Sequence, residues 1–439
     1  MPDIRITDLS WGGQGLGRLE GKVVFVPFSL PGEVAEIDLV YSKKNYSQGK
    51  LRRLLEVSPD RIEPPCVFYQ KCGGCQLQHM APDKQIREKE RLFRQSLEHS
   101  LKDKEILIKP ALISPLALGY RHRLQLKSSW KNNRFNLGFF RAETHDVVSI
   151  DHCLLANREV NAVLETLQEK IQSLPLQEWT PAIDLQFLGN PAKGGLVFTS
   201  NRRISKDQKK RITRELLADY PLNYLLFQES QQLDFRGQHT FSPEKDSPEF
   251  TLPAAETGLP KDLILSCFPL VFSQINLALN QQLIKELYHL NLFDSQETIL
   301  DLYCGLGNFS LPLSFLVRDV IGLEVFPLAV ANARWNQKHN RIANCTFGSA
   351  KAHEGIQQLR NRKITQVILD PPRTGAREVI SSLDGWPLRG ILYISCNPMT
   401  LFRDLIHLRE KGWKVEWIQP IDFFPQTYHL ESVTCLRKK

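Results

Sequence analysis

The last part of the chain alternates short apolar runs with stretches of helical spacing. From about residue 263 onward, five runs have the composition of buried β-strands, and at least two amphipathic helices are expected between them. The expected strands are 298–303, 320–324, 365–370, 390–395 and 413–418, and the expected helices include 274–290 and 327–339. Strands separated by helices predict an α/β fold, a doubly wound (Rossmann-like) parallel sheet covered on both faces.

The first 60 residues have a different pattern, which predicts short strands and tight turns. A glycine-rich turn at 11–17 is followed by a β-rich run at 22–27, a Pro-Gly turn at 31–32 and an alternating run at 33–40. This pattern predicts a small β-barrel, a shape that often binds nucleic acid.

The middle of the chain is mixed. Helical spacing predicts a helix over 84–101, and alternation predicts strands within 120–151. Residues 154–255 combine both patterns, and the polar segment 242–249 has the composition of a loop.

Composition places the chain among soluble globular proteins, with 42% hydrophobic and 24% charged residues. No apolar run approaches the roughly 18 residues that a membrane-spanning helix needs. The N-terminus does not resemble a signal peptide, so we expect a cytoplasmic protein that does not contact membranes.

The formal net charge is +8, and its distribution is uneven. Basic residues gather within 43–53, 84–94, 121–131 and 202–214. Such clusters attract a polyanion, although each one alone is equally compatible with a solvated helix face. Four clusters in the first half favour a nucleic-acid partner.

A glycine turn follows the first strand of the doubly wound region, in the order Gly305-Leu306-Gly307. A dinucleotide-binding fingerprint would place a third glycine where Ser310 stands, which argues against a bound pyrophosphate. The next strand ends at Glu324, at the distance where an acid contacts ribose hydroxyls. These features predict a binding site for S-adenosylmethionine. The alternative is that the turn has a purely structural role.

Two further strands end in chemically distinctive loops, Asp370-Pro371-Pro372-Arg373 and Ser395-Cys396-Asn397-Pro398. In an open α/β sheet the ligand lies at the carboxyl ends of the strands. Backbone amides before the following helix would favour the thiolate of Cys396, the nucleophilic form. The alternatives are an inert buried cysteine and, for Glu431 near the C-terminus, an ordinary surface acid.

Methylation of uridine at C5 would use all of these groups. Because C5 of uridine is a weak nucleophile, a thiolate must first add to C6, and a base must afterwards remove the C5 proton. Cys396, Glu431 and the Gly305 loop would supply the nucleophile, the base and the methyl-donor site.

With these motifs, together with Phe272-Ser273-Gln274-Ile275-Asn276 and His429-Leu430-Glu431, the sequence resembles the RNA uracil-C5 methyltransferases. It is most similar to the bacterial RlmD type, which acts on 23S ribosomal RNA. The resemblance implies that Gln274, Tyr303, Asn308 and Glu324 contact S-adenosylmethionine and that Asp370 lies between cofactor and uracil. It also implies that Cys396 is the nucleophile and Glu431 the base. Lys351 stands where the family usually has Asn or Asp.

The resemblance also divides the chain. Residues 1–59 would form a TRAM barrel that binds RNA. Residues 60–83 and 118–255 would form a central α+β, RNA-binding, iron–sulfur domain, and 84–117 with 256–439 the methyltransferase domain. We expect a monomer without a stable protein partner. Some relatives methylate transfer RNA instead, so that substrate stays open.

Nine cysteines without an export signal are not expected to form disulfides. Cys66, Cys72 and Cys75 lie close together, and Cys153 could be a fourth ligand. Four cysteines suit zinc or an iron–sulfur cluster, and unligated thiols are the third possibility. The family resemblance favours a [4Fe–4S] cluster with a structural or RNA-recognising role.

Two other function classes stay open on sequence grounds. An acidic-Pro-Pro loop also occurs in enzymes that methylate amino groups, whose chemistry needs neither Cys396 nor Glu431. A non-catalytic RNA-binding iron–sulfur protein is the other possibility.

Overall fold

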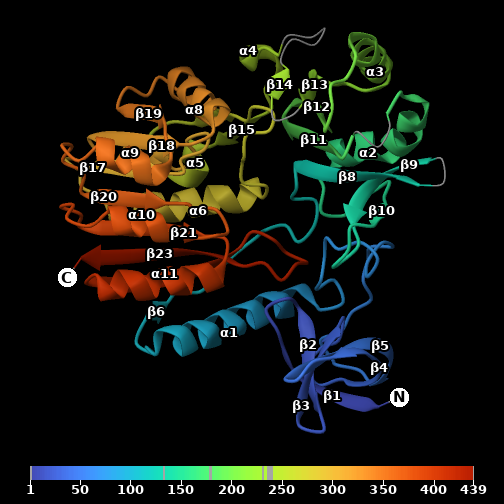
Figure 1. The fold of residues 1–439 in the computed structure, drawn as a ribbon. Helices are drawn as coiled ribbons and strands as arrows, with labels where there is room; N and C mark the ends of the chain where they lie inside the picture. The colour runs from blue at the N-terminus through green and yellow to red at the C-terminus, as the bar shows by residue number, and fades with distance from the viewer. Residues whose placement is uncertain (1, 132–133, 177–179, 230–231, 235–240, 439) are drawn as a thin grey trace.

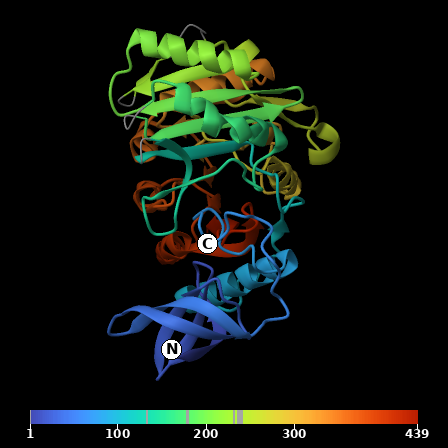
Figure 2. The same ribbon diagram turned by 90° about the vertical axis from the view of Figure 1, so that its right-hand side faces the viewer.

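The computed structural model describes residues 2–131, 134–176, 180–229, 232–234 and 241–438. Its strands form a closed barrel, a seven-stranded sheet, a nine-stranded sheet and a short two-stranded sheet. Figures 1 and 2 show the barrel at one end of the molecule, separated from the two large sheets by helix α1 (Pro82–Leu101).

The predicted N-terminal barrel is confirmed. Its strands follow the order β1-β2-β3-β5-β4. Their bounds are β1 (Asp3–Leu9), β2 (Gln14–Leu19), β3 (Lys22–Pro27), β4 (Val34–Ser42) and β5 (Tyr46–Glu56). Alternate residues such as Ile4, Ile6 and Ile37 fill the interior, as period-two patterning requires. On the outside, Arg52 and Arg53 pair with Asp38 and Glu36, which offsets part of this basic cluster.

The seven-stranded sheet forms the centre of the chain, in the order β10-β9-β8-β11-β12-β13-β14. Its strands are β8 (Arg123–Lys131), β9 (Arg134–Phe140), β10 (Val147–Ser149), β11 (Ala182–Gly189), β12 (Ala192–Ser200), β13 (Tyr224–Glu229) and β14 (Gln232–Asp234). Helices α2 (Arg158–Lys170) and α3 (Lys206–Asp219), with the 3-10 turn η1 (Ile171–Ser173), pack into one core on a face of this sheet.

The predicted loop over 242–249 is wrong. It begins with a short helix, α4 (Pro243–Asp246), whose Asp246 carboxylate accepts a hydrogen bond from the backbone of Ser242 at 2.7 Å. It ends in β15 (Glu249–Leu252), which pairs with β16 (Leu263–Ser266) and buries Leu252. A short helix, α5 (Ala254–Thr257), lies between these strands. No side chain of α4 is buried, and the buried Phe250 and Leu252 lie just beyond the polar segment.

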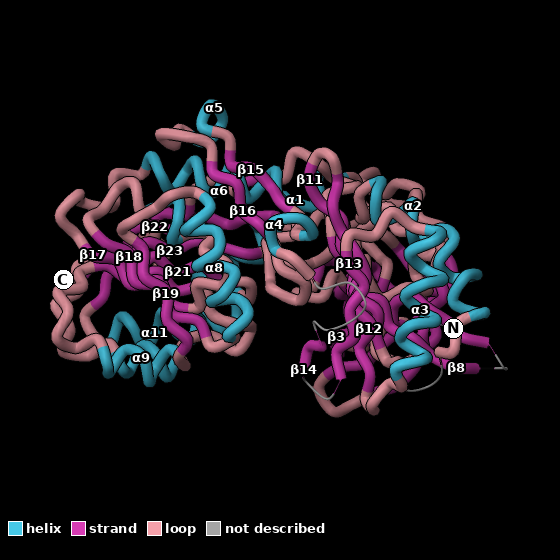
Figure 3. Tube along the Cα trace, turned by 90° about the horizontal axis from the view of Figure 1, so that it is seen from above, coloured by secondary structure: helices cyan, strands magenta, loops and turns pink. Residues whose placement is uncertain are grey.

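The predicted doubly wound fold is confirmed for the C-terminal region (Figure 3). The nine-stranded sheet runs in the order β19-β18-β17-β20-β21-β23-β22-β6, and β7 also pairs with β22. Its strands are β17 (Thr298–Leu302), β18 (Asp319–Glu324), β19 (Cys345–Ser349), β20 (Gln366–Leu369), β21 (Gly390–Ser395), β22 (Trp413–Asp422), β23 (Glu431–Lys438), β6 (Leu107–Ile108) and β7 (Leu112–Ile113).

Helices cover both faces of this sheet, and successive strand residues face opposite cores. Ile299 packs with α6 (Leu277–His289), α7 (Ser310–Leu313) and α8 (Pro327–His339). Its neighbour Leu300 packs on the other face, with α1 and three later helices. Those helices are α9 (Ala352–Gln358), α10 (Arg377–Ser382) and α11 (Pro398–Glu410). Such two-sided burial explains why the strands of this sheet are nearly continuous apolar runs.

The expectation of an all-parallel sheet is wrong at one place. Strand β23 lies between β21 and β22 and is antiparallel to both. The first residues of β23 therefore lie at the same edge as the last residues of β21, which is where the ligand site of such sheets lies. No helix in the described part of the chain is long and apolar enough to cross a membrane.

Candidate active site

The glycine turn after β17 is held open by left-handed backbone. Tyr303, Gly305 and Gly307 have φ values of 66°, 54° and 89°. A Cβ placed on Gly305 would meet no described atom within 4 Å, so the backbone there borders open space. The Glu324 carboxylate accepts hydrogen bonds from Gly305 N at 3.3 Å and from Phe326 N at 2.9 Å. Glu324 thus fixes the turn against the end of β18.

Other predicted cofactor residues border the same edge of the sheet. The side-chain amide of Asn308 exchanges hydrogen bonds with that of Asn280 on α6 at 2.8 and 3.0 Å. Gln274 is buried in the segment before α6. That segment is held by the central sheet, because Arg123 donates to Val271 O at 2.8 Å and His122 bonds Ser273 at 3.0 Å. No described contact joins Lys351 to this group; its ammonium pairs with Glu354 at 3.3 Å.

Asp301 belongs to this site, although it was not among the predicted site residues. It is fully buried, and one carboxylate oxygen accepts from the Ser310 hydroxyl while the other has no hydrogen-bond partner among the described residues. Burial raises the pKa of Asp301 to about 7. Burial, Asp301 and Glu324 together raise the pKa of Asp370 to about 7 as well. An acid four residues before Gly305, at the end of a predicted strand, is the signal that could have identified it.

Cys396 and Glu431 are brought together by the antiparallel strand. Ser395 at the end of β21 pairs with Ser432 at the start of β23, so the next residues along, Cys396 and Glu431, are neighbours. Glu431 is only 6% exposed, so its interpretation as a surface acid is wrong. Burial, followed by the charge of Asp370, raises the pKa of Glu431 to about 8, opposed by Arg373.

The expected lowering of the Cys396 pKa by backbone amides is also wrong in this state of the protein. Burial, Glu431 and Asp370 raise the pKa of this partly buried thiol to about 11, and they outweigh Arg373 and the local backbone. The thiol therefore needs a proton acceptor before it can act as a nucleophile.

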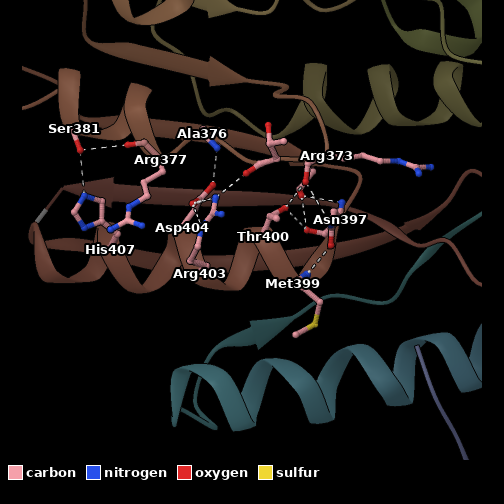
Figure 4. A network of polar contacts seen from close by, with 12 residues as sticks. Arg373, Ala376, Arg377, Ser381, Asn397, Met399, Thr400, Arg403, Asp404 and His407 are labelled. Atoms are coloured by element: carbon pink, nitrogen blue, oxygen red, sulfur yellow. Dashed lines mark hydrogen bonds and ion pairs between the residues drawn. The ribbon is translucent and has the colours of Figure 1, made fainter. Parts of the chain in front are cut away.

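A polar network fixes the Cys396 loop against the Asp370 loop (Figure 4). Arg373 O accepts from the Asn397 side chain at 3.3 Å and from the Thr400 hydroxyl at 3.2 Å. The carboxylate of Asp404, buried on α11, accepts from Ala376 N and from the Tyr393 hydroxyl, both at 2.7 Å. Both loops are therefore fixed to α11, which sets Asp370 and Cys396 relative to each other.

A second candidate site lies away from this edge of the sheet. The four predicted cysteines, Cys66, Cys72, Cys75 and Cys153, all line one cavity of about 130 Å³. Arg121 lines it too, and its Nε atom is buried without a hydrogen-bond partner among the described residues. Within those residues, no three Cys, His, Asp or Glu side chains are grouped closely enough to hold a single metal ion.

The doubly wound sheet carries a glycine turn and, at the end of the next strand, an acid placed to contact ribose hydroxyls. With a buried carboxyl beside a cysteine, these features define a class of protein, the S-adenosylmethionine-dependent methyltransferases. Comparison with known proteins identifies the family within this class. A family model described as tRNA (Uracil-5-)-methyltransferase matches residues 83–439, and one described as TRAM domain matches residues 3–51. This chain therefore belongs to the RNA (uracil-5-)-methyltransferase family, with an N-terminal TRAM domain.

Full-length relatives agree with this assignment. The chain is 31% identical to the 23S rRNA (uracil(1939)-C(5))-methyltransferase RlmD of Erwinia tasmaniensis, over 99% of this chain and 96% of that protein. It is also 31% identical to an uncharacterised RNA methyltransferase of Thermosynechococcus vestitus, over 99% and 97%. In fold it is similar to the Pyrococcus abyssi tRNA (uracil-54, C5)-methyltransferase, with a TM-score of 0.72, 23% identity and coverage of 99% and 100%.

The predicted family, its use of S-adenosylmethionine and the TRAM barrel are confirmed. The roles of individual residues, the domain boundaries and the iron–sulfur cluster stay predictions.

Proposed function

We propose that this enzyme methylates C5 of a uridine in 23S ribosomal RNA through a covalent bond between Cys396 and uracil C6, giving 5-methyluridine. The observation that carries this proposal is the pairing of β21 with β23, which sets the buried Glu431 beside Cys396. Full-length similarity to enzymes named for 23S ribosomal RNA supports that substrate. Such an RNA substrate implies a cytoplasmic enzyme.

Each step of the proposed reaction uses a different residue. The Cys396 thiolate adds to C6, and the electrons of the 5,6 double bond move toward C4 and its oxygen. C5 then takes the methyl group from S-adenosylmethionine. Glu431 removes the remaining C5 proton, and the electrons of that C–H bond re-form the double bond and expel Cys396. Asp370, beside both groups, would orient the uracil.

The cofactor site would be formed by Gln274, Tyr303, Asn308 and Glu324. Glu324 would accept from ribose hydroxyls, since it already ends β18 at the glycine turn. S-adenosylmethionine supplies an electrophilic methyl group on a positively charged sulfur. The buried acids Asp301 and Asp370 suit that charge, because both have raised pKa values and gain from a nearby cation.

The cysteine cavity fits an iron–sulfur cluster. A [4Fe–4S] cluster is several atoms across, so its four ligands surround a cavity rather than converge on one point, which is the arrangement of Cys66, Cys72, Cys75 and Cys153. A cluster held by four thiolates is anionic, and the partly buried Arg121 on the cavity wall suits an anion. A tetrahedral zinc ion would need the four sulfurs much closer together. When bound, the cluster would order this part of the chain.

The test is a methylation assay with labelled S-adenosylmethionine on unmodified 23S ribosomal RNA and on unmodified transfer RNA, followed by nucleoside analysis. The expected product is 5-methyluridine in the ribosomal RNA alone. Methylation of transfer RNA alone would contradict the substrate, and a methyl group on nitrogen or ribose would contradict the chemistry.

A further inference from the structure

Glu431 follows a loop that is irregular but buried. The loop 423–430 joins β22 to β23, and Phe423, Thr427 and Leu430 within it are each at most 1% exposed. Loops usually run over the surface because their backbone polar groups need partners. This loop obtains its partners from two other parts of the chain.

Gln426 is the centre of these contacts. It is 5% exposed and has a φ of 71°, a left-handed backbone conformation that residues other than glycine rarely adopt. Its N–H donates to Gln85 Oε1 at 2.9 Å, and its own Oε1 accepts from Gln85 Nε2 at 3.0 Å. The paired amides therefore join the loop to helix α1, and they stabilise a backbone conformation that would otherwise be unfavourable.

The cysteine-bearing segment makes the second set of contacts. Gln76 and Leu77, directly after Cys75, both donate their backbone N–H to Gln426 O, at 3.1 and 3.0 Å. Gln85 donates back to Leu77 O at 3.0 Å. One glutamine of α1 thus bonds the end of the cysteine segment and the loop before Glu431 at the same time.

The cavity wall touches the same loop from the other side. The Tyr120 hydroxyl donates to Pro425 O at 3.0 Å. Arg121, which lines the cysteine cavity, lies over the Phe424 ring with its guanidinium carbon 5.9 Å from the ring centre. A buried ion pair, Lys89 with Asp422 at 2.8 Å, fixes the beginning of the loop to α1. The loop is therefore held on one side by α1 and on the other by the walls of the cysteine cavity.

We propose that Gln85 and Gln426 are positioning residues for proton removal, which transmit the conformation of the cysteine-bearing segment 66–77 to Glu431. This role rests on the proposed function, in which Glu431 is the base. Neither glutamine touches the uracil; each acts by fixing the backbone that leads into β23. An ordered cysteine segment then sets Glu431 against Cys396, whereas a disordered one loosens the base and leaves the nucleophile in place on β21.

The consequence is specific to one step. Addition of Cys396 to C6 depends on β21 and α11, while resolution of the adduct depends on Glu431. Loss of the glutamine contacts should therefore slow resolution and spare addition. Displacement of a catalytic group by about 1 Å can slow a step by up to about 100-fold, and we expect roughly tenfold here.

The variant Gln426→Gly tests this role, because glycine accepts a φ of 71° without strain while losing the side-chain contact. Gln85→Ala is the second variant, and Gln95→Ala on the exposed face of α1 is the matched control. Each full-length holoenzyme is mixed in single turnover with transcribed 23S ribosomal RNA. RNA containing 5-fluorouridine reports addition, and ordinary RNA reports the decay of the covalent complex on denaturing gels. Iron content, thermal unfolding and binding of S-adenosylhomocysteine check integrity.

We expect covalent complex to accumulate in Gln426→Gly, with decay about tenfold slower and addition within twofold of the control. Equal slowing of both steps with a lower melting temperature would show a general structural role and overturn the proposal. Decay rates equal to those of Gln95→Ala would overturn it too. If the unsubstituted enzyme methylates RNA but forms no adduct with 5-fluorouridine RNA, the proposed covalent mechanism fails instead, before any variant is compared.

Discussion

The two candidate sites of this enzyme are built with opposite charge. At the carboxyl edge of the nine-stranded sheet, three carboxyl groups crowd together, and the pKa values of Asp301, Asp370 and Glu431 are all raised. The cysteine cavity is lined instead by a cation, the partly buried Arg121, whose Nε atom is buried without a hydrogen-bond partner among the described residues. Buried charges persist where something compensates for them. The first site thus suits a positively charged ligand, the sulfonium of S-adenosylmethionine, and the second an anionic cluster.

The largest expected effect is at the base. Glu431→Gln keeps the shape of the site but cannot accept the C5 proton, so turnover should fall by about 10²–10⁴-fold. Because addition and methyl transfer still occur, covalent enzyme–RNA should accumulate on denaturing gels. Glu416→Gln on β22, where Glu416 pairs with Lys414, is the control and should behave normally. Loss of activity without any covalent complex would mean that Glu431 serves an earlier step.

The next prediction concerns the other site. Arg121→Met removes the cation from the wall of the cysteine cavity, so the proposed anionic cluster should bind less well. Anaerobically purified variant protein should hold less than half of the wild-type iron and sulfide, with weaker visible absorption. Arg158→Met, at the exposed start of α2, should retain both. Unchanged iron in Arg121→Met would contradict the charge assignment of this cavity.

A smaller effect should distinguish two forms of the cofactor. Asp301→Asn removes a buried acid near the donor site, so S-adenosylmethionine should bind about tenfold more weakly, a loss of roughly 1.4 kcal/mol. The product, S-adenosylhomocysteine, has a neutral sulfur and should lose less than threefold. Calorimetric titration of both ligands checks this. An equal loss of affinity for both ligands would show that Asp301 shapes the pocket and does not interact with the sulfonium charge.

The smallest effect concerns pH. Because the pKa of Glu431 is raised to about 8, the group is mostly protonated at pH 7 and gains its basic form as pH rises. Decay of the covalent complex should therefore slow about tenfold for each pH unit below 8 and level off above it. Asp370→Asn removes a negative neighbour, which lowers the Glu431 pKa and moves the midpoint to lower pH. A midpoint that stays in place would contradict this coupling.

The sequence predicts most of the fold because its strongest patterns are local. Apolar runs give the strands of the doubly wound sheet, and helix 327–339 matches α8 at both ends. Residues 242–249 mislead, since their loop-like composition includes a short helix, α4, that is closed by the hydrogen bond from Ser242 N to Asp246. The same limit applies to Glu431. Reaction chemistry and the family resemblance both predicted it as the base, but its burial depends on an antiparallel strand that no local pattern indicates.

The charge state of the site was also beyond local prediction. Position at the end of a strand suggests an activated thiol at Cys396, yet the carboxyls of Asp370 and Glu431 come from other strands and raise its pKa. Asp301 was missed for a related reason: it precedes the glycine turn in the sequence, but its unpaired buried oxygen is seen only in the packed structure.

The most direct test of the central claim uses 23S ribosomal RNA in which uridine is replaced by 5-fluorouridine. A base cannot remove fluorine from C5 as it removes a proton, so the covalent adduct cannot be resolved. Incubation with S-adenosylmethionine should trap a covalent complex, and mass spectrometry of the digested protein should place the methylated nucleotide on Cys396. Cys396→Ala should give no complex. Methyl transfer without any bond to Cys396 would contradict the account.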